Sequence, residues 1–315
     1  MADFVDQALF ILTEVANILL FVGRILVLTV IGSVKALLPV GVLPRKSVRD
    51  KNVLITGAGS GMGRELAVRF GNLGARIVLW DVNASGNAET KKILEKNGVK
   101  AFDYTVNLCN VDEINETAKK VLNEVGDVDI VINCAGIVTG KRFLDCPDAA
   151  IKRTIDVNTN AVMFVTKAFL PRMLSRNVGH IVTLASIAGH LGVVGLVDYC
   201  ASKYGAVGFM EALHRELYAL RADVKTTTIG PYFVNTGMFD GVRESKIPFL
   251  LPFLETDYVV DRIVDATLTD TVTVLIPKIL YFIKALGAIF PQSVTDYIMD
   301  ELDVDKFMDT FKGRN

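Results

Sequence analysis

The sequence has little of what several classes of protein depend on. It contains three histidines and four cysteines among 315 residues. The cysteines, Cys109, Cys134, Cys146 and Cys200, form neither a CxxC pair nor a disulfide framework, which indicates reduced thiols on the cytosolic side of any membrane. The histidines show no metal-ligand spacing, so we expect no metal centre.

An excess of charge of either sign is also absent. The 34 basic and 35 acidic residues leave a net charge of -1, and no basic block is large enough to indicate a nucleic-acid surface. Low-complexity tracts and internal repeats are lacking as well. Apolar residues make up 51% of the chain, which is enough to bury the core of one large domain.

The first concentration of apolar residues lies near the N-terminus. Residues 15–34, VANILLFVGRILVLTVIGSV, carry a single charge, Arg24, and as a helix would extend over about 30 Å, the thickness of a bilayer's hydrocarbon core. A spanning anchor is favoured over a helix in the membrane interface and over burial against protein. Acidic residues precede this run and LPRKSVRDK follows it, so the positive-inside rule places the rest of the chain in the cytosol.

A glycine-rich turn follows in NVLITGAGSGMGRELAVRFGNLGARIVLWDVN, residues 52–83. The pattern predicts a buried strand over 52–56, a turn with glycines at 57, 59, 61 and 63, a helix over 63–73 and a second strand that ends at Asp81. Glycine lets the backbone approach a diphosphate, which the N-terminus of the helix attracts. A carboxylate at Asp81 suits two ribose hydroxyls and repels a 2′-phosphate, so the pattern favours NAD over NADP.

Strands and helices continue to alternate along the chain. Strand-like segments near 100–108, 129–136, 179–186 and 224–231 are separated by predicted helices near 111–125, 150–175 and 198–221. Repeated βα units predict the α/β class: a single domain, residues 45–315, with a doubly wound, Rossmann-like parallel sheet, preceded by a membrane anchor and its flank in residues 1–44. Ligands of such sheets bind at the carboxyl ends of the strands.

Tyr199 and Lys203 lie four residues apart, and so on one face of the last of these helices. A nearby ammonium favours the phenolate, and the positive nicotinamide of bound NAD would add to this effect, so Tyr199 could accept the proton of an alcohol. Ordinary packing is the alternative, because the pair can occur in any helix. Ser186, at the end of a strand, can hold the substrate oxygen beside the phenol, and this favours the catalytic interpretation.

Several motifs resemble those of the short-chain dehydrogenase/reductase family. They are TGAGSGMG at 56–63, NCAG at 133–136 and YCASK at 199–203. In that family Asn, Ser, Tyr and Lys in this order form a catalytic tetrad, which implies catalysis by Asn158, Ser186, Tyr199 and Lys203. The resemblance further implies that Asn158 orders a proton-relay water, that Lys203 holds the nicotinamide ribose, and that two chains pair as a homodimer.

The resemblance also implies a cofactor site along the strand ends. Asn133 matches a residue that supports the central sheet and the adenine ribose, and Asn107 stands where an aspartate usually caps the adenine amino group. PYFVNT, residues 231–236, matches the segment that holds the nicotinamide carboxamide, although Gly230 precedes Pro231 in reverse of the usual order. The expected NAD contacts are Gly57, Ser60, Gly61, Met62, Gly63, Asp81, Asn107, Leu108, Asn133, Ala135, Gly136, Tyr199, Lys203, Pro231, Val234 and Thr236.

Segments outside these motifs resemble the microsomal retinol and 17-beta-hydroxysteroid dehydrogenases of the family. They are GIVTGKRFLDCPD, DYCASKYGAVGFMEAL, VNTGMFDGV and IPKILYFIKALGAIFP. The resemblance implies an NAD-dependent oxidoreductase of the endoplasmic reticulum membrane, or of lipid droplets, that converts all-trans-retinol to retinaldehyde reversibly. The alternatives are a 17-beta-hydroxysteroid or other lipid-alcohol dehydrogenase, and a non-catalytic membrane protein that retains the fold.

Apolar residues past Thr236 indicate the same kind of substrate. IPFLLPFL, residues 247–254, is too apolar for a solvated lid and suits an oily ligand or contact with lipid. The first six of residues 272–291 predict the last strand. The remainder predicts an amphipathic helix at a membrane or substrate rim, with ordinary core as the alternative. The acidic C-terminal segment, residues 296–315, predicts a solvated helix.

Overall fold

The computed structural model describes residues 2–38 and 41–313. Its chain divides into two compact units, Met1–Arg45 and Lys46–Asn315. The first unit consists chiefly of one helix, and the second carries the sheet that positions the site.

The helix of the first unit is α1 (Ala2–Leu37). Its apolar stretch Phe4–Val34 has no buried residue, and its 31 residues extend over about 46 Å, more than the hydrocarbon core of a bilayer. Thr13 and Thr29 each donate their hydroxyl to the carbonyl oxygen four residues earlier, at 2.8 Å, so both polar groups are satisfied within the helix. The expected N-terminal apolar helix is confirmed, and it is a candidate membrane anchor.

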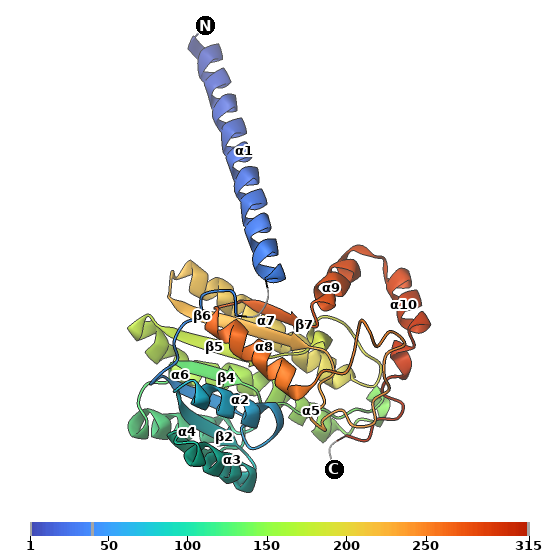
Figure 1. Cartoon of the computed structure of the whole chain (residues 1–315). Coiled ribbons are helices and arrows are strands. Elements are labelled where there is room, and N and C mark those ends of the chain that lie inside the picture. Colours follow the sequence, from blue (N-terminus) through green and yellow to red (C-terminus); the bar gives the residue numbers. More distant parts are fainter. Residues whose placement is uncertain (1, 39–40, 314–315) are drawn as a thin grey trace. The chain divides into compact units, whose positions relative to one another are not determined.

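The second unit contains a seven-stranded sheet in the order β3-β2-β1-β4-β5-β6-β7, in which every neighbouring pair is parallel (Figure 1). The strands are β1 (Asn52–Thr56), β2 (Arg76–Asp81), β3 (Ala101–Thr105), β4 (Ile130–Asn133), β5 (Gly179–Leu184), β6 (Val224–Pro231) and β7 (Thr273–Ile276). The chain order reverses between β1 and β4, which is where doubly wound sheets bind ligands. The predicted fold class is confirmed.

Helices connect these strands, and α9 and α10 follow the last strand. They are α2 (Gly61–Asn72), α3 (Ala84–Lys96), α4 (Val111–Glu124), α5 (Asp148–Ile155), α6 (Ala161–Arg176), α7 (Val197–Ala219), α8 (Thr256–Leu268), α9 (Ile279–Ile289) and α10 (Gln292–Glu301). Single turns of 3-10 helix, η1 (Phe143–Asp145), η3 (Ile187–Gly189) and η4 (Val304–Lys306), and one π-helical turn, η2 (Asp156–Asn160), complete the described elements.

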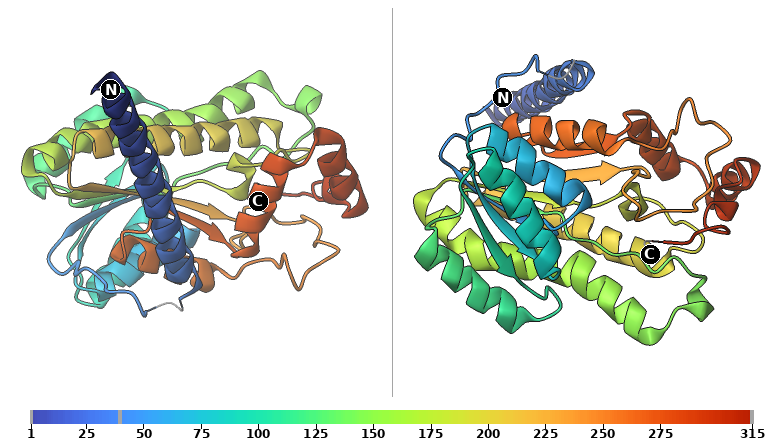
Figure 2. Two further views of the ribbon diagram at one scale, coloured as in Figure 1. Left: turned by 90° about the horizontal axis from the view of Figure 1, so that it is seen from above. Right: turned by 60° about the horizontal axis from the view of Figure 1, so that its bottom comes forward.

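Two layers of helices cover the two faces of the sheet (Figure 2). One hydrophobic core lies under α2, α3 and α8, and another lies under α4, α6 and α7. Successive residues of β1 serve the two cores alternately, since Val53 and Ile55 pack into the first and Leu54 into the second. Because both faces are covered, β1 and β4 each bury three consecutive apolar residues, Val53–Ile55 and Ile130–Ile132.

The structure differs from the predictions in two places. The helix expected near 150–175 is divided by η2 into α5 and α6. The C-terminal segment is exposed along α10, but Phe307 and Met308 beyond it are only 4% and 8% exposed. The expected solvated helix is found in α10 as far as Glu301 and is wrong beyond it, because Phe307 packs against Phe233 and Met308 packs in the cluster around Tyr199.

Candidate active site

The turn between β1 and α2 brings the backbone close to its neighbours. The N–H groups of Gly57 and Ala58 donate to the carbonyl oxygen of Trp80, at 2.8 and 3.2 Å, and fix the turn to β2. Gly57 has a φ of +70°, and a Cβ there would lie 2.8 Å from Cα of Ala135. A Cβ at Gly63 would collide with the carbonyl oxygen of Gly57. Glycine is therefore required at both positions, and the N-terminus of α2 stays accessible to an anion.

A groove of ≈ 330 Å³ passes this turn and the carboxyl ends of β2, β3 and β4. Eleven of the residues expected at the cofactor line it: Gly57, Ser60, Gly61, Met62, Gly63, Asp81, Asn107, Leu108, Ala135, Gly136 and Thr236. The sequence did not predict nine further lining residues: Val82, Asn83, Val106, Cys109, Cys134, Ile137, Arg153, Val157 and Met238. Several of these directly follow or precede predicted contacts, whereas Arg153 and Met238 are brought in by the fold.

Asp81 is held at the rim of this groove by two backbone donors. Its Oδ2 accepts from the N–H of Gly59 and its Oδ1 from that of Asn83, both at 2.8 Å. These two hydrogen bonds fix the position of the carboxylate at the end of β2, and each oxygen can still accept another hydrogen bond. Together with the glycine turn, this geometry fits a dinucleotide whose ribose hydroxyls donate to Asp81.

The loop after β4 is held by hydrogen bonds to the side chain of Thr56, at the end of β1. Thr56 accepts two hydrogen bonds at its Oγ1, from the N–H groups of Cys134 and Ala135, both at 3.1 Å. Asn133 is 3% exposed and donates to the hydroxyls of Thr166 and Thr183, at 3.3 and 3.4 Å. Asn133 therefore lies beneath the groove and does not line it, and its contacts agree with the expected support of the central sheet.

Two other expected cofactor positions have local partners. Asn107 accepts at Oδ1 from the N–H of Cys109, at 3.0 Å, so the amide already closes a turn at the groove. Pro231 ends β6 and Val234 pairs with Leu254; neither lines the groove, although Thr236 does. The sequence predicted the segment 231–236 but not which of its side chains reach the groove.

Asn158 lies on the π-helical turn η2, a type of irregularity that is frequent at functional sites. The side chain is 1% exposed. It accepts from the N–H of Ile137 and donates to the carbonyl oxygen of the same residue, both at 2.9 Å. It also donates to Ser202 Oγ at 3.0 Å. Asn158 thereby joins the loop after β4 to α7.

The other three members of the predicted tetrad meet at the head of α7. Tyr199 and Lys203 are buried there, with Lys203 Nζ 5.6 Å from the centroid of the Tyr199 ring. The Lys203 ammonium donates to the carbonyl oxygen of Leu184, the last residue of β5, at 2.9 Å. Ser186 follows that strand and forms a hydrogen bond with Tyr199. The structure therefore brings together all four residues, since a Cβ on Gly136 would lie 3.5 Å from Asn158 Oδ1 and 3.6 Å from Lys203 Nζ.

In the chain without cofactor, burial is the main influence on the pKa values of Tyr199 and Lys203. It raises the pKa of Tyr199, an effect that the hydrogen bond from Ser186 partly offsets. It lowers the pKa of Lys203 to about 8. In the protein alone, desolvation therefore outweighs the effects that would make the phenol more acidic. The expected acidification of Tyr199 by Lys203 together with bound NAD stays a prediction.

An apolar cavity of ≈ 270 Å³ begins at Ser186 and Tyr199. Its walls come from the loop 247–251, from α9 and α10, and from Phe307. Edge-on aromatic contacts support it, with Phe239 5.9 Å from Tyr199 and Phe233 5.0 Å from Phe239, between ring centroids. The buried C-terminal residue Phe307 thus forms part of this wall.

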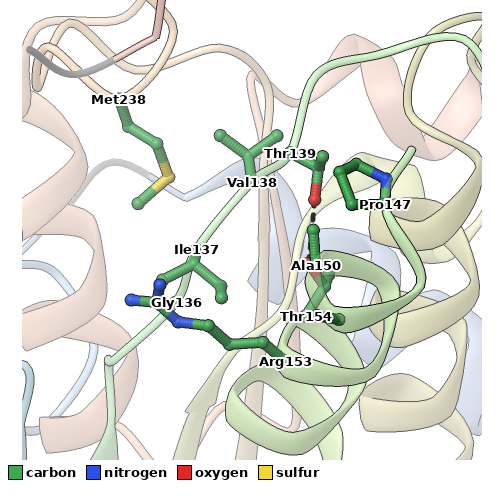
Figure 3. Close-up of a pocket in the computed structure, with 10 residues that line it drawn as sticks. Gly136, Ile137, Val138, Thr139, Pro147, Ala150, Arg153, Thr154 and Met238 are labelled. Carbon is green, nitrogen blue, oxygen red and sulfur yellow. Dashed lines mark hydrogen bonds between the residues drawn. The ribbon is translucent and has the colours of Figure 1, made fainter. Parts of the chain in front are cut away.

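A second hollow, of ≈ 610 Å³, lies between the loop after β4 and α5 (Figure 3). It shares Gly136, Ile137, Arg153 and Met238 with the groove. Thr139 Oγ1 lies 3.1 Å from Thr154 Oγ1 and donates to Asp198 at 2.6 Å, which ties this loop to α5 and to α7. The hollow is therefore a widening of the cofactor groove on the side of α5.

A family model described as short chain dehydrogenase matches residues 51–247, the part of the chain that holds the glycine turn, Asp81 and the four catalytic candidates. The chain belongs to the short-chain dehydrogenase family. It is 45% identical to epidermal retinol dehydrogenase 2 of Mus musculus over 306 residues, which cover 96% of this chain and 97% of that protein. It is 40% identical to retinol dehydrogenase 10 of Homo sapiens, with coverage of 84% and 86%.

Solved structures of this short-chain dehydrogenase family share the fold. A member from Burkholderia phymatum in complex with NAD superposes with a TM-score of 0.69 at 26% identity, over 76% of this chain and 93% of that one. A metagenomic member in complex with NADP gives 0.62 at 27% identity, over 73% and 98%. With these relatives and the fitted groove, the protein is an NAD-dependent oxidoreductase that acts on an alcohol or its carbonyl product.

Proposed function

We propose that the protein is a membrane-anchored dehydrogenase of a lipophilic alcohol, with all-trans-retinol as its substrate. The observation that carries the proposal is that Ser186 and Tyr199 line the apolar cavity, while Lys203, whose Nζ is 5.6 Å from the centroid of the Tyr199 ring, lies beside Gly136 of the cofactor groove. An alcohol placed there would have its hydroxyl at the polar end and its hydrocarbon along the apolar wall. The names of the two retinol dehydrogenase relatives support a retinoid.

The roles of the residues follow from their contacts. NAD held in the groove would supply the acceptor for the hydride that leaves the carbinol carbon. Tyr199 takes the hydroxyl proton, and Ser186, already hydrogen-bonded to the phenol, holds the substrate oxygen beside it. Lys203 supplies positive charge behind the phenol, and its bond to Leu184 fixes its position. Asn158 acts through the loop after β4 and through α7, both of which it joins.

Location and assembly belong to the same proposal. We place α1 in the endoplasmic reticulum membrane with Lys46–Asn315 in the cytosol, which the basic segment after α1 and the four free cysteines support. We expect a homodimer from the family. Protease protection of terminal tags in sealed microsomes tests the orientation, and a protected C-terminal tag would contradict it.

The deciding experiment measures NADH formation by the purified full chain with all-trans-retinol and with estradiol. We expect retinol to be preferred, and expect Tyr199→Phe to lose at least about a hundredfold in kcat, because that change removes the proton-transferring hydroxyl. Tyr204→Phe is the matched control, since Tyr204 lies on the same helix and is 48% exposed. Preference for estradiol would replace retinol by a 17-beta-hydroxysteroid, and full activity of Tyr199→Phe would indicate that the site is not catalytic.

A further inference from the structure

Large apolar side chains are exposed around the apolar cavity. Phe249 is 81% exposed, Ile289 74% and Tyr297 66%. They belong to the loop 247–254, to α9 and to α10, three segments that also supply walls of the cavity. Figures 1 and 2 show α9 and α10 following one another at one end of the sheet.

Three further residues connect this surface with the cavity. Leu250, Phe282 and Ile298 line the cavity and are nevertheless 38%, 59% and 37% exposed. The apolar lining therefore continues from Tyr199 outward to the protein surface. We call the six residues Phe249, Leu250, Phe282, Ile289, Tyr297 and Ile298 the apolar rim.

An apolar rim of this kind normally marks a surface that is covered in the working protein. Two occupants fit such chemistry, a lipid bilayer and a second copy of the chain. The sequence supplies the argument for lipid. The eight residues 38–45 between α1 and Lys46 can extend over no more than about 29 Å, so a membrane entered by α1 is within reach of this unit.

The composition of the rim also suits the boundary of a bilayer. Tyr prefers the level of the headgroups, where its apolar ring and its polar hydroxyl are both satisfied, and Phe suits the apolar layer just below. On α10, Val294, Tyr297 and Ile298 share one side, while Asp296 and Asp300 fall on another. The acidic side favours a zwitterionic lipid surface over an anionic one.

We propose that the apolar rim inserts into the surface of a zwitterionic bilayer as a membrane contact in addition to α1, and that the cavity opens there directly to lipid. A lipophilic alcohol dissolved in the bilayer then reaches Tyr199 without crossing water. The delivery of substrate rests on the proposed function, whereas the membrane contact itself does not.

The contact is tested by tryptophan fluorescence in the full chain. Trp80, the single tryptophan, is fully buried, so a tryptophan placed on the rim reports separately from it. We expect vesicles of phosphatidylcholine with brominated acyl chains to quench the added fluorescence of Phe249→Trp and Tyr297→Trp at least about threefold more than that of Tyr218→Trp. Tyr218 is 69% exposed and lies at the far end of α7, where β6 begins.

Equal quenching of all three variants, with the chain bound to the vesicles, would overturn the proposal. The proposal would also be overturned if brominated lipid did not quench the rim tryptophans and their fluorescence changed with protein concentration. That result would indicate that the rim is an interface between two copies of the chain. Neither reading depends on turnover. If rim quenching is found and no lipophilic alcohol is oxidised, the proposed function fails and the membrane contact stands.

The delivery of substrate is tested by removing three rim side chains that do not line the cavity. We expect Phe249→Ser, Ile289→Ser and Tyr297→Ser together to lower kcat/KM about tenfold for an alcohol dissolved in vesicles. Turnover of a short, water-soluble secondary alcohol should stay unchanged. An equal loss for both alcohols would show that the rim supports the fold of the cavity and does not deliver substrate from lipid.

Discussion

Lys203 should destabilise the fold that it serves. Its side chain is 4% exposed, and burial lowers its pKa from 10.5 to about 8. That difference corresponds to about 3 kcal/mol lost from the free energy of unfolding at neutral pH. The sign follows from proton binding: the unfolded chain binds this proton more tightly than the folded chain. The destabilisation is therefore complete below about pH 8 and disappears as the pH rises from 8 to 10.5.

The variant Lys203→Met removes the charge and keeps most of the volume. It also leaves the carbonyl oxygen of Leu184 without its 2.9 Å donor, which costs about 1 kcal/mol. We expect a net gain of about 2 kcal/mol in the free energy of unfolding at pH 7, with a gain near zero at pH 10, together with loss of NADH formation.

Urea unfolding of the purified full chain at the two pH values measures this gain. Lys167→Met is the control, since Lys167 is exposed on α6 and its replacement should change stability by less than about 0.5 kcal/mol. A Lys203→Met variant that is less stable than the wild type at pH 7, with no dependence on pH, would refute the reasoning. It would show that the ammonium is better solvated by its surroundings than its burial indicates.

Three further predictions concern the base of the groove, the cofactor preference and the amino ends of the strands. Thr56→Val leaves the N–H groups of Cys134 and Ala135 without an acceptor, so it should lower the free energy of unfolding by about 2–4 kcal/mol and weaken NADH binding. Thr56→Ser keeps the hydroxyl and should retain both stability and NADH binding within about 1 kcal/mol. Urea unfolding measures the stability, and NADH fluorescence titration measures the binding. Asp81→Asn keeps an acceptor for the N–H of Gly59 and removes the charge, so the ratio of kcat/KM for NADP over NAD should rise about tenfold or more, and an unchanged ratio would contradict the assigned role. Burial, and the nearby Lys46 and Lys225, hold the pKa of His180 well below 6.5. Its contribution to stability is therefore present above pH 6.5 and is lost below it by about 1 kcal/mol per pH unit. His180→Gln should reduce the difference between the free energies of unfolding measured at about pH 7.0 and 5.5.

Local signals in the sequence predicted much of the cofactor groove. The β-branched run before Gly57 and the acid after the second strand are sufficient to place β1, the turn and Asp81, because turn chemistry and strand periodicity act over a few residues. Residues next to these motifs, such as Val82 and Val106, also line the groove, and a wider reading of each strand end would have included them.

The remainder depends on tertiary packing that no short pattern encodes. The π-helical turn that aims Asn158 at Ile137 has a helical sequence on both sides. Phe307 and Met308 lie in an acidic segment, and only the fold shows that Phe307 lines the apolar cavity and that Met308 packs in the cluster around Tyr199. The raised pKa of Tyr199 in the protein alone has the same origin, since spacing reveals a neighbouring charge but not the loss of water around the phenol.

The loss of water around Tyr199 and Lys203 connects the cofactor groove with the apolar cavity. Desolvation raises the pKa of Tyr199 and lowers that of Lys203, so the protein alone favours the neutral form of each group more than water does. A phenol in this state is a poor base, and it becomes a better one only when positive charge arrives in the groove beside Gly136. The same dry surroundings accept hydrocarbon along the cavity that begins at Tyr199. Cofactor binding should therefore precede productive binding of the alcohol, because the alcohol finds a competent base only in the charged complex.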